Sequence, residues 1–209
     1  MISPTLARSL LIEIILIMIT ISLNPFVLKR LLLVFLLLVI VSCVTGRAEA
    51  LLVSVKNTPY DRQMSRIQPV LLSQSPAKSQ EVSLRLVNQW IGGLRSIPYG
   101  FTKVWKTPAE TQSGQPADCK AKAVALYEKM KANGATDLRL VIGKRTTRSR
   151  STHAWVEWQT EDGNYVLDPT INWMAYRSSD LGPRTYVPYY AFAGNHKYRA
   201  AQSTLVAQN

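Results

Sequence analysis

The sequence predicts an α+β domain in which one helix packs on an antiparallel sheet. Apolar residues recur at helical spacing over residues 118–131, the clearest helix of the chain. Downstream, residues 138–142, 152–159 and 165–168 have the composition and alternation of strands. The last two strands flank Glu161-Asp162-Gly163-Asn164, which is typical of a hairpin turn. A helix followed by consecutive strands indicates the α+β class.

The predicted helix at 118–131 is amphipathic. Asp118 is a suitable N-cap, and Asn133-Gly134 supplies a stop signal. The side expected to face the sheet carries Cys119, Ala123, Leu126, Tyr127 and Met130. The side expected to face solvent carries Lys120, Lys122, Lys129 and Lys131. A second helix is predicted upstream over residues 81–94, followed by a loop.

Composition divides the chain into three parts. Residues 1–50 form an apolar leader, and residues 51–80, rich in Ser, Gln and Pro, are predicted to be a linker. The remaining residues, 81–209, form the predicted domain. Its last part, 171–209, is rich in Tyr and is expected to be an irregular packed extension with a frayed tail.

The leader indicates export, in a mode that the sequence leaves open. Lys29-Arg30 precede the apolar run Leu31–Val41, and small residues follow at Ala48-Glu49-Ala50, as in a cleaved signal peptide. Ile40–Cys43 is similar to a lipobox, which would make Cys43 the lipid-bearing residue. An uncleaved membrane anchor is the third reading. Residues 1–27 fit an over-extended start as well as a genuine segment. We expect a periplasmic or membrane-anchored protein.

Charge points to acidic partners. The chain has 25 Lys and Arg against 13 Asp and Glu, a formal net charge of +12. Such an excess favours anionic polymers, membrane surfaces or an acidic protein substrate. No nucleic-acid motif is present, and none is expected in an exported protein. The densest basic cluster, residues 144–150, is either a solvated loop or a rim that selects substrate.

Three residues stand in the order that thiol chemistry needs. Cys119 is the only cysteine outside the leader, so it has no disulfide partner within its domain. A helix N-terminus favours the thiolate that attacks. His153 is placed to act as the base and Asp168 to orient the imidazole. A buried, inert cysteine is the alternative reading for Cys119 alone.

The hairpin register decides whether His153 and Asp168 can meet. If Gln159 lies opposite Asn164, Asp168 becomes the diagonal neighbour of His153 on the same face. If Thr160 instead pairs with Tyr165, the two residues are about 13 Å apart by strand rise. A three-residue loop would place them on opposite faces.

Three segments resemble the transglutaminase-like superfamily, in particular the bacterial transglutaminase-like cysteine proteinases. They are Ala117-Asp118-Cys119 with the helix that follows, Ser151–Trp158, and Val166–Thr170. Val104–Glu110 is similar to the stretch that precedes the cysteine in those proteinases. The resemblance covers about residues 81–170. It implies a papain-like core with Cys119 as nucleophile, His153 as base and Asp168 as orienting acid.

The resemblance also raises the question of calcium, which some bacterial members bind through acidic residues beside the cysteine. Here Lys120 and Ala121 stand where those members carry Glu and Asp, and a lysine would repel the metal. We therefore expect no metal and no other cofactor. With two histidines and no cysteine pair, a zinc site has no support either.

The sequence thus predicts an exported cysteine hydrolase that cleaves protein or peptide substrates through an acyl-enzyme. Transglutaminase-type acyl transfer is one alternative, and a non-catalytic module that binds acidic partners is another. Trp155 and Trp158 are expected in the sheet core, Glu157 on the His153 face and His196 at the surface. Trp105 is expected to pack or to shield the thiol. The substrate and the oligomeric state are not readable from the sequence.

Overall fold

The computed structural model describes residues 51–74, 82–112 and 114–201. The leader, with Cys43, and residues 202–209 lie outside the described residues, as do residues 75–80 of the predicted linker. No helix within the described ranges is long and apolar enough to cross a membrane.

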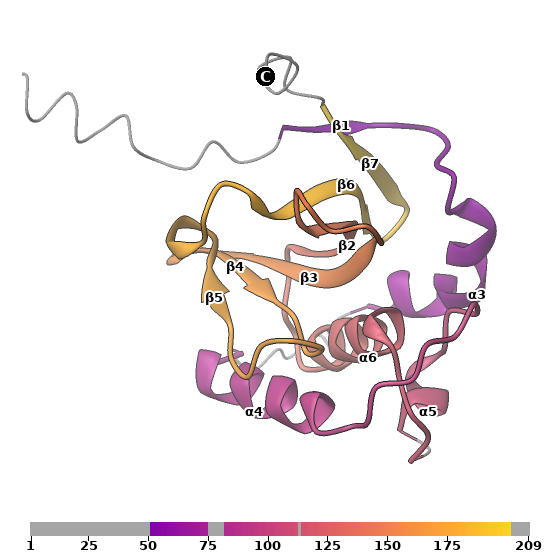
Figure 1. Cartoon of the computed structure of the whole chain (residues 1–209), viewed down its shortest axis with the longest axis vertical. Coiled ribbons are helices and arrows are strands. Elements are labelled where there is room, and N and C mark those ends of the chain that lie inside the picture. Colours follow the sequence, from indigo (N-terminus) through magenta and orange to yellow (C-terminus); the bar gives the residue numbers. More distant parts are fainter. Residues whose placement is uncertain (1–50, 75–81, 113, 202–209) are drawn as a thin grey trace, which may run out of the picture. The chain divides into compact units, whose positions relative to one another are not determined.

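Helices come mostly before strands along the chain (Figure 1). The order is β1 (Leu52–Ser54), α3 (Asp61–Leu71), α4 (Leu84–Arg95), α5 (Pro108–Thr111), α6 (Cys119–Ala132), β2 (Leu138–Thr146), β3 (His153–Thr160), β4 (Gly163–Leu167), β5 (Tyr176–Arg177), the 3-10 turn η1 (Ser178–Asp180), β6 (Thr185–Ala193) and β7 (His196–Ala200). The seven strands form one sheet in the order β1-β7-β6-β2-β3-β4-β5, with all pairs antiparallel. The predicted α+β class is confirmed.

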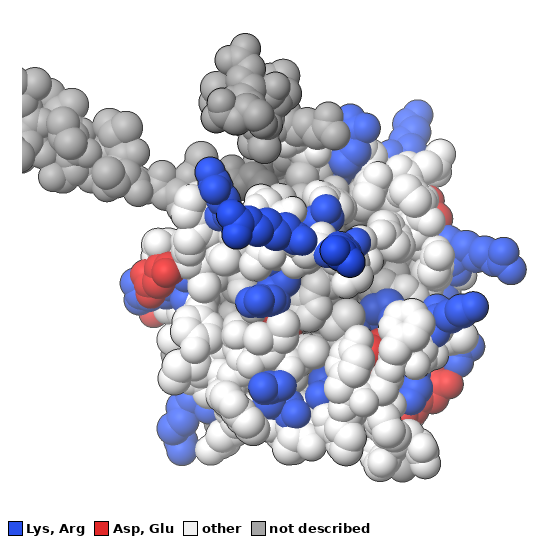
Figure 2. All heavy atoms as spheres, in the orientation of Figure 1, with Lys and Arg blue, Asp and Glu red and all other residues white. Residues whose placement is uncertain are grey.

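Basic side chains are more common than acidic ones on the face seen in the orientation of Figure 1. Lys and Arg outnumber Asp and Glu on this face (Figure 2), in keeping with the net charge of +12. The basic cluster at 144–150 begins in the last residues of β2 and continues through the turn that leads into β3. Arg145, Arg148 and Arg150 are exposed there.

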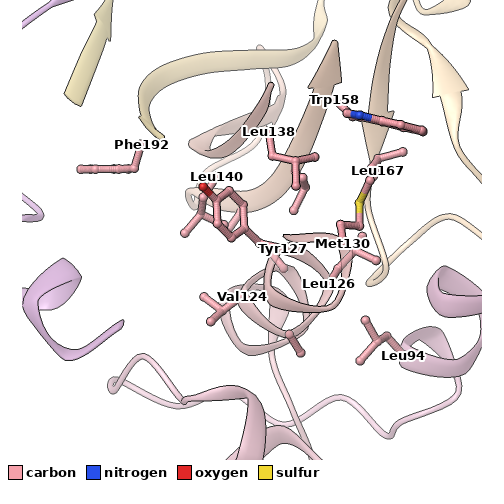
Figure 3. Packing of buried hydrophobic residues seen from close by; sticks show 14 of the residues in the cluster. Leu94, Val124, Leu126, Tyr127, Met130, Leu138, Leu140, Trp158, Leu167 and Phe192 are labelled. Atoms are coloured by element: carbon pink, nitrogen blue, oxygen red, sulfur yellow. The ribbon is translucent and has the colours of Figure 1, made fainter. Parts of the chain in front are cut away.

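The larger of two cores lies between the helices and one face of the sheet (Figure 3). α6 contributes Val124, Leu126, Tyr127 and Met130, and α4 contributes Leu94. The sheet side carries Leu138, Leu140, Trp158, Leu167 and Phe192. The opposite face of the sheet holds a smaller cluster of Val141, Trp155, Val166, Tyr186 and Ala191. Two buried faces fix which side chains of each strand point toward the helices.

The helix predicted at 118–131 is confirmed as α6, but its expected amphipathicity is wrong. Helix α6 is central and is buried on nearly all sides, Lys122 included, which is only 2% exposed. The Lys122 ammonium donates to the carbonyl oxygens of Arg95 (3.4 Å), the last residue of α4, and of Ile97 (2.6 Å), two residues beyond it. Those carbonyls are the negative end of α4, so they compensate a buried cation. Burial, and next the charge of Arg95, lower the pKa of Lys122.

Two segments are more ordered than the sequence predicted. Residues 51–80 were expected to be a linker, but β1 pairs with β7, and α3 buries Met64, Ile67 and Leu71 in the main core. Residues 171–209 were expected to be irregular, but β6 pairs with β2 at the centre of the sheet. The loop expected after the helix at 81–94 also contains the short helix α5, which begins with a capping box between Thr107 and Glu110.

Candidate active site

A groove at the N-terminus of α6 brings distant segments together. It is lined by Tyr60, Tyr99, Phe101, Trp105, Cys119, Lys120, Ile142, Ser151, Thr152, His153 and Ala154. Two of the three predicted site residues, Cys119 and His153, are among them. The third, Asp168, lies behind His153 and is completely buried.

Cys119 is the first residue of α6, as predicted. Asp118 caps the helix, since its Oδ1 accepts from the Ala121 N–H at 3.1 Å. Cys119 is free and only 9% exposed, and it lines the groove. The unpaired N–H groups of a first helical turn and the positive end of the helix dipole favour negative charge at this position.

His153 joins the thiol to the carboxylate. Its Nε2 lies 2.7 Å from Asp168 Oδ2, which leaves Nδ1 for the Cys119 thiol, the other group that acts on the imidazole. Burial disfavours the imidazolium, but the hydrogen bonds to Asp168 and Cys119 and their charges outweigh it and raise the pKa of His153 to about 9. The imidazole is therefore mainly protonated at neutral pH.

Asp168 is held by three donors. Besides His153, the Tyr186 hydroxyl donates to Oδ2 at 2.9 Å and the Thr170 N–H donates to Oδ1 at 2.9 Å. Burial by itself would raise the pKa of Asp168, but these hydrogen bonds, with that of His153 the strongest, lower it. Burial and the neighbouring carboxylate raise the pKa of Tyr186, which therefore remains a donor. The Asn172 amide in turn donates to the Tyr186 hydroxyl at 3.0 Å.

The hairpin adopts the first of the two registers. Gln159 pairs with Asn164 and the ladder runs on to Val156 opposite Leu167, so Asp168 follows on the same face as His153. Thr160 also pairs with Gly163, and the loop is therefore tighter than the four residues expected. Gly163 has φ +126°, a conformation that favours glycine. This is the register that lets His153 and Asp168 meet, although the loop is shorter than the four residues assumed for it.

A glycine opposite His153 makes room for the aromatic packing behind the imidazole. Gly143 pairs with His153, and a Cβ there would lie 2.7 Å from the Trp155 ring and 2.1 Å from the Val187 carbonyl oxygen. Trp155 stacks on His153 with ring centroids 6.3 Å apart and meets Tyr186 edge-on at 5.4 Å. Trp155 is fully buried, as expected of a core residue, and it forms part of the support of the imidazole.

The other residues discussed in the sequence analysis have mainly structural positions. Trp158 is in the core, and His196 is exposed. Glu157 accepts a hydrogen bond from the Trp155 indole at 3.2 Å. Trp105 is buried and also lines the groove, so packing and shielding of the thiol are not exclusive there.

Sequence reasoning missed Tyr186 and the role of Lys120. Tyr186 belongs to the segment expected to be irregular. Its backbone has a φ of 48°, which is unusual for a tyrosine and which nothing in the sequence predicts. Lys120 was expected to face solvent, yet its ammonium donates to Asp118 Oδ2 and to the Thr102 carbonyl at 2.9 Å. Only 17% of its side chain is exposed.

The residues beside Cys119 do not fit a calcium ion. The Lys120 ammonium contacts the Asp118 oxygen that a cation would have to share, and Ala121 offers no side-chain ligand. Over the ranges that the structure describes, no group of three or more His, Cys, Asp or Glu is arranged to hold a metal ion.

Comparison with known proteins gives structural matches only. No protein-family model matches the chain, and no curated protein matches it by sequence. Among solved structures, Legionella pneumophila LapG in its calcium-bound form is 15% identical, with a TM-score of 0.49, 72% of this chain covered and 86% of that chain. LapG treated with EGTA is 16% identical, with a TM-score of 0.49 and coverages of 70% and 81%. A further LapG structure is 15% identical, with a TM-score of 0.48 and coverages of 73% and 85%. Likeness at this level leaves the activity to be argued from the site itself.

Proposed function

We propose that this protein is a cysteine hydrolase that cleaves peptide bonds, with Cys119 as nucleophile, His153 as acid and base, and Asp168 as the group that orients the imidazole. One observation carries the proposal: a single imidazole, hydrogen-bonded to a fully buried carboxylate, shares a groove with a free thiol at a helix N-terminus. A buried pair of charged groups such as His153 and Asp168 is not needed for packing. Its position beside the thiol in the groove is typical of a functional site.

The geometry supports a defined sequence of proton transfers. The Cys119 thiolate attacks the carbonyl carbon of the scissile bond, and the oxyanion forms near the Cys119 N–H at the start of α6. The Nδ1–H of His153 then protonates the departing amine as the C–N bond breaks, which leaves a thioester. Water loses a proton to Nδ1 as it attacks the thioester, and the thiolate departs. Asp168 holds Nε2–H throughout, so that Nδ1 points at the reacting atoms.

Two other functions use the same residues differently. In transglutaminase-type transfer, an amine in place of water attacks the thioester. In a binding module, the groove and the basic cluster at 144–150 hold an acidic partner without covalent chemistry. A binder has no use for a carboxylate-bonded imidazole in the same groove as a free thiol, and this favours an enzyme.

The test is the rate of alkylation of the folded protein by iodoacetamide at pH 7. We expect fast, stoichiometric labelling of Cys119 that is abolished in Cys119→Ala and slowed about a hundredfold in His153→Ala, the usual range for loss of a proton-transfer group. His196→Ala is the matched control, because His196 is the other histidine and is exposed on β7. Slow labelling of the wild type, unaffected by His153→Ala, would favour the binding module.

The substrate and the location complete the proposal. We infer a protein substrate with acidic residues near the cleaved bond, because exposed Arg148 and Arg150 precede the groove residues Ser151 and Thr152. Cleavage of an acidic peptide that does not weaken at high salt would count against this. Export through the leader at 1–50 is tested by cell fractionation of the full chain, and cytoplasmic recovery would contradict it.

A further inference from the structure

We propose that Lys120 is a positioning residue whose ammonium group, paired with Asp118, fixes an aromatic wall of the groove that receives a bulky apolar side chain of the substrate. This inference rests on the proposed function, and it names both a residue and a substrate class for that site. The wall is the segment Tyr99–Trp105.

The starting point is the buried carboxylate of Asp118. Its side chain is 0% exposed, so in the absence of partners its charge would be costly to bury. Oδ1 accepts from the Ala121 N–H at the start of α6, and Oδ2 accepts from the Thr102 N–H at 3.1 Å and from Lys120. The carboxylate thus joins the helix that carries the thiol to the neighbouring segment that contains Thr102.

Thr102 is held at both ends of its own backbone. Its N–H donates to Asp118 Oδ2, and its carbonyl accepts from the Lys120 ammonium at 2.9 Å. The same ammonium lies 5.0 Å from the centre of the Phe101 ring, within reach of a cation–π attraction. One cation therefore fixes the course of the chain at Thr102 and the ring of the residue before it.

The segment needs such a clamp because it has no regular secondary structure. Residues 98–107 lie between α4 and α5 and belong to no helix or strand. Ala117 donates to the Pro98 carbonyl at 2.9 Å, and Arg66 donates to the Trp105 carbonyl at 2.9 Å. These ties secure the two ends of the segment, and the pair of Asp118 and Lys120 secures its middle.

The segment held by Asp118 and Lys120, a pair here called the clamp, forms an apolar surface beside the thiol. Tyr99 and Phe101 are 60% and 72% exposed, yet both line the groove together with Cys119 and the buried Trp105. Exposed rings in a concave site are the usual lining for an apolar ligand group. A peptide whose scissile carbonyl reaches Cys119 would place a neighbouring side chain against them.

The experiment compares two thiol reagents on the full chain. One is a dipeptidyl chloromethyl ketone with phenylalanine next to the reactive residue, and the other is the same reagent with glycine in place of phenylalanine. We expect the wild type to react about tenfold faster with the phenylalanine reagent, since one apolar side chain in a pocket contributes that much discrimination. Lys120→Met should reduce the ratio to about two, and Lys120→Arg, which keeps the cation, should restore most of it.

Lys103→Met is the matched control, because Lys103 lies in the same segment, is exposed and loses the same charge. Amide hydrogen exchange over residues 98–107 supplies a readout that is independent of the thiol. It should become about tenfold faster in Lys120→Met and stay unchanged in Lys103→Met, with β2 unchanged in both, because local opening is reported separately from global unfolding.

The outcomes separate this inference from the proposed function. If Lys120→Met leaves both the reagent ratio and the exchange of residues 98–107 unchanged, the clamp is wrong even though Cys119 reacts. If exchange accelerates across the whole chain, Lys120 has only a stabilising role and the inference is also overturned. If exchange responds locally but Cys119 of the wild type does not react with iodoacetamide, the clamp stands as structure and the proposed hydrolase fails.

Discussion

Two fully buried carboxylates flank the groove, and they are satisfied in different ways. Asp168 lies on the sheet side and pairs with an imidazole, a phenol and a backbone N–H. Asp118 lies on the helix side and pairs with an ammonium group and two backbone N–H groups, of Ala121 and Thr102. The desolvation problem is the same, but Asp168 is paired with an imidazole, whose pKa is raised to about 9, and Asp118 with a lysine ammonium group.

This difference indicates a division of labour. The sheet side supplies a network that can move a proton, held by the register of β3 and β4 and by Tyr186 from β6. The helix side supplies a fixed cation that sets the shape of the wall around the thiol. Mutations on the sheet side should then alter proton transfer to and from the thiol, and mutations on the helix side should alter the geometry of the wall. The predictions below test this separation.

The largest effect should come from removing the charge of Asp168. Asp168→Asn keeps the size of the side chain but removes its charge. The new amide N–H would face the Thr170 N–H or the Tyr186 hydroxyl, both of which donate to the carboxylate in the wild type. We expect labelling of Cys119 by iodoacetamide to slow about a hundredfold at pH 7, because the imidazole loses its orientation and its countercharge.

Asp118→Asn sharpens the comparison on the opposite side of the groove. It should slow the same reaction by less than about fivefold, since it alters shape and no proton transfer. Asp162→Asn, in the exposed hairpin turn, controls for the substitution itself. Equal losses in Asp118→Asn and Asp168→Asn would refute the division of labour.

The pH dependence of stability should be the next effect in size. The pKa of His153 is raised in the folded protein from 6.5 to about 9. Its contribution to stability is therefore fully present below about pH 6.5 and is lost as the pH rises through 9. We expect the difference in unfolding free energy between the wild type and His153→Gln to shrink by on the order of 2 kcal/mol between pH 6 and 10.

Urea titrations at several pH values measure this difference. The raised tyrosine pKa values of Tyr60, Tyr99, Tyr127 and Tyr186 also weaken the fold at high pH, but they are common to both proteins and cancel in the comparison. A difference that stays constant from pH 6 to 10 would show that the imidazole is not coupled to the carboxylate and the thiol as described.

Local sequence signals predicted the parts of the site that depend on local geometry. The N-cap at Asp118 fixed where α6 begins and therefore where Cys119 lies. The alternation around Glu161–Asn164 predicted a hairpin, and its register then determined that His153 and Asp168 share a face. These inferences need only helix and strand periodicity, which the sequence carries directly.

The parts that were missed depend on partners far along the chain. β6 contains Pro188, which argues against a central strand, but Pro188 pairs with Gly143 at a register shift in β2 where the ladder is irregular. Lys122 is buried because carbonyls at the end of α4 receive it, 25 to 27 positions away. In α3, the apolar residues are spaced at helical intervals, but polar residues and Pro69 dilute the pattern.

The smallest expected effect is that of removing divalent metal, and it tests the helix side of the groove. Lys120 supplies the positive charge next to Asp118, so EGTA or EDTA should shift the melting temperature of the full chain by less than about 1 °C and the iodoacetamide rate by less than about twofold. A divalent ion at Asp118 would have to displace the Lys120 ammonium group, which is already hydrogen-bonded to Asp118 and to Thr102, and would leave that cation without these partners in a mostly buried position.

Lys120→Met removes this competitor and serves as the comparison, measured with and without calcium. A marked loss of stability or labelling on chelation of the wild type would show that a metal ion, and not Lys120, satisfies the buried carboxylate beside the thiol.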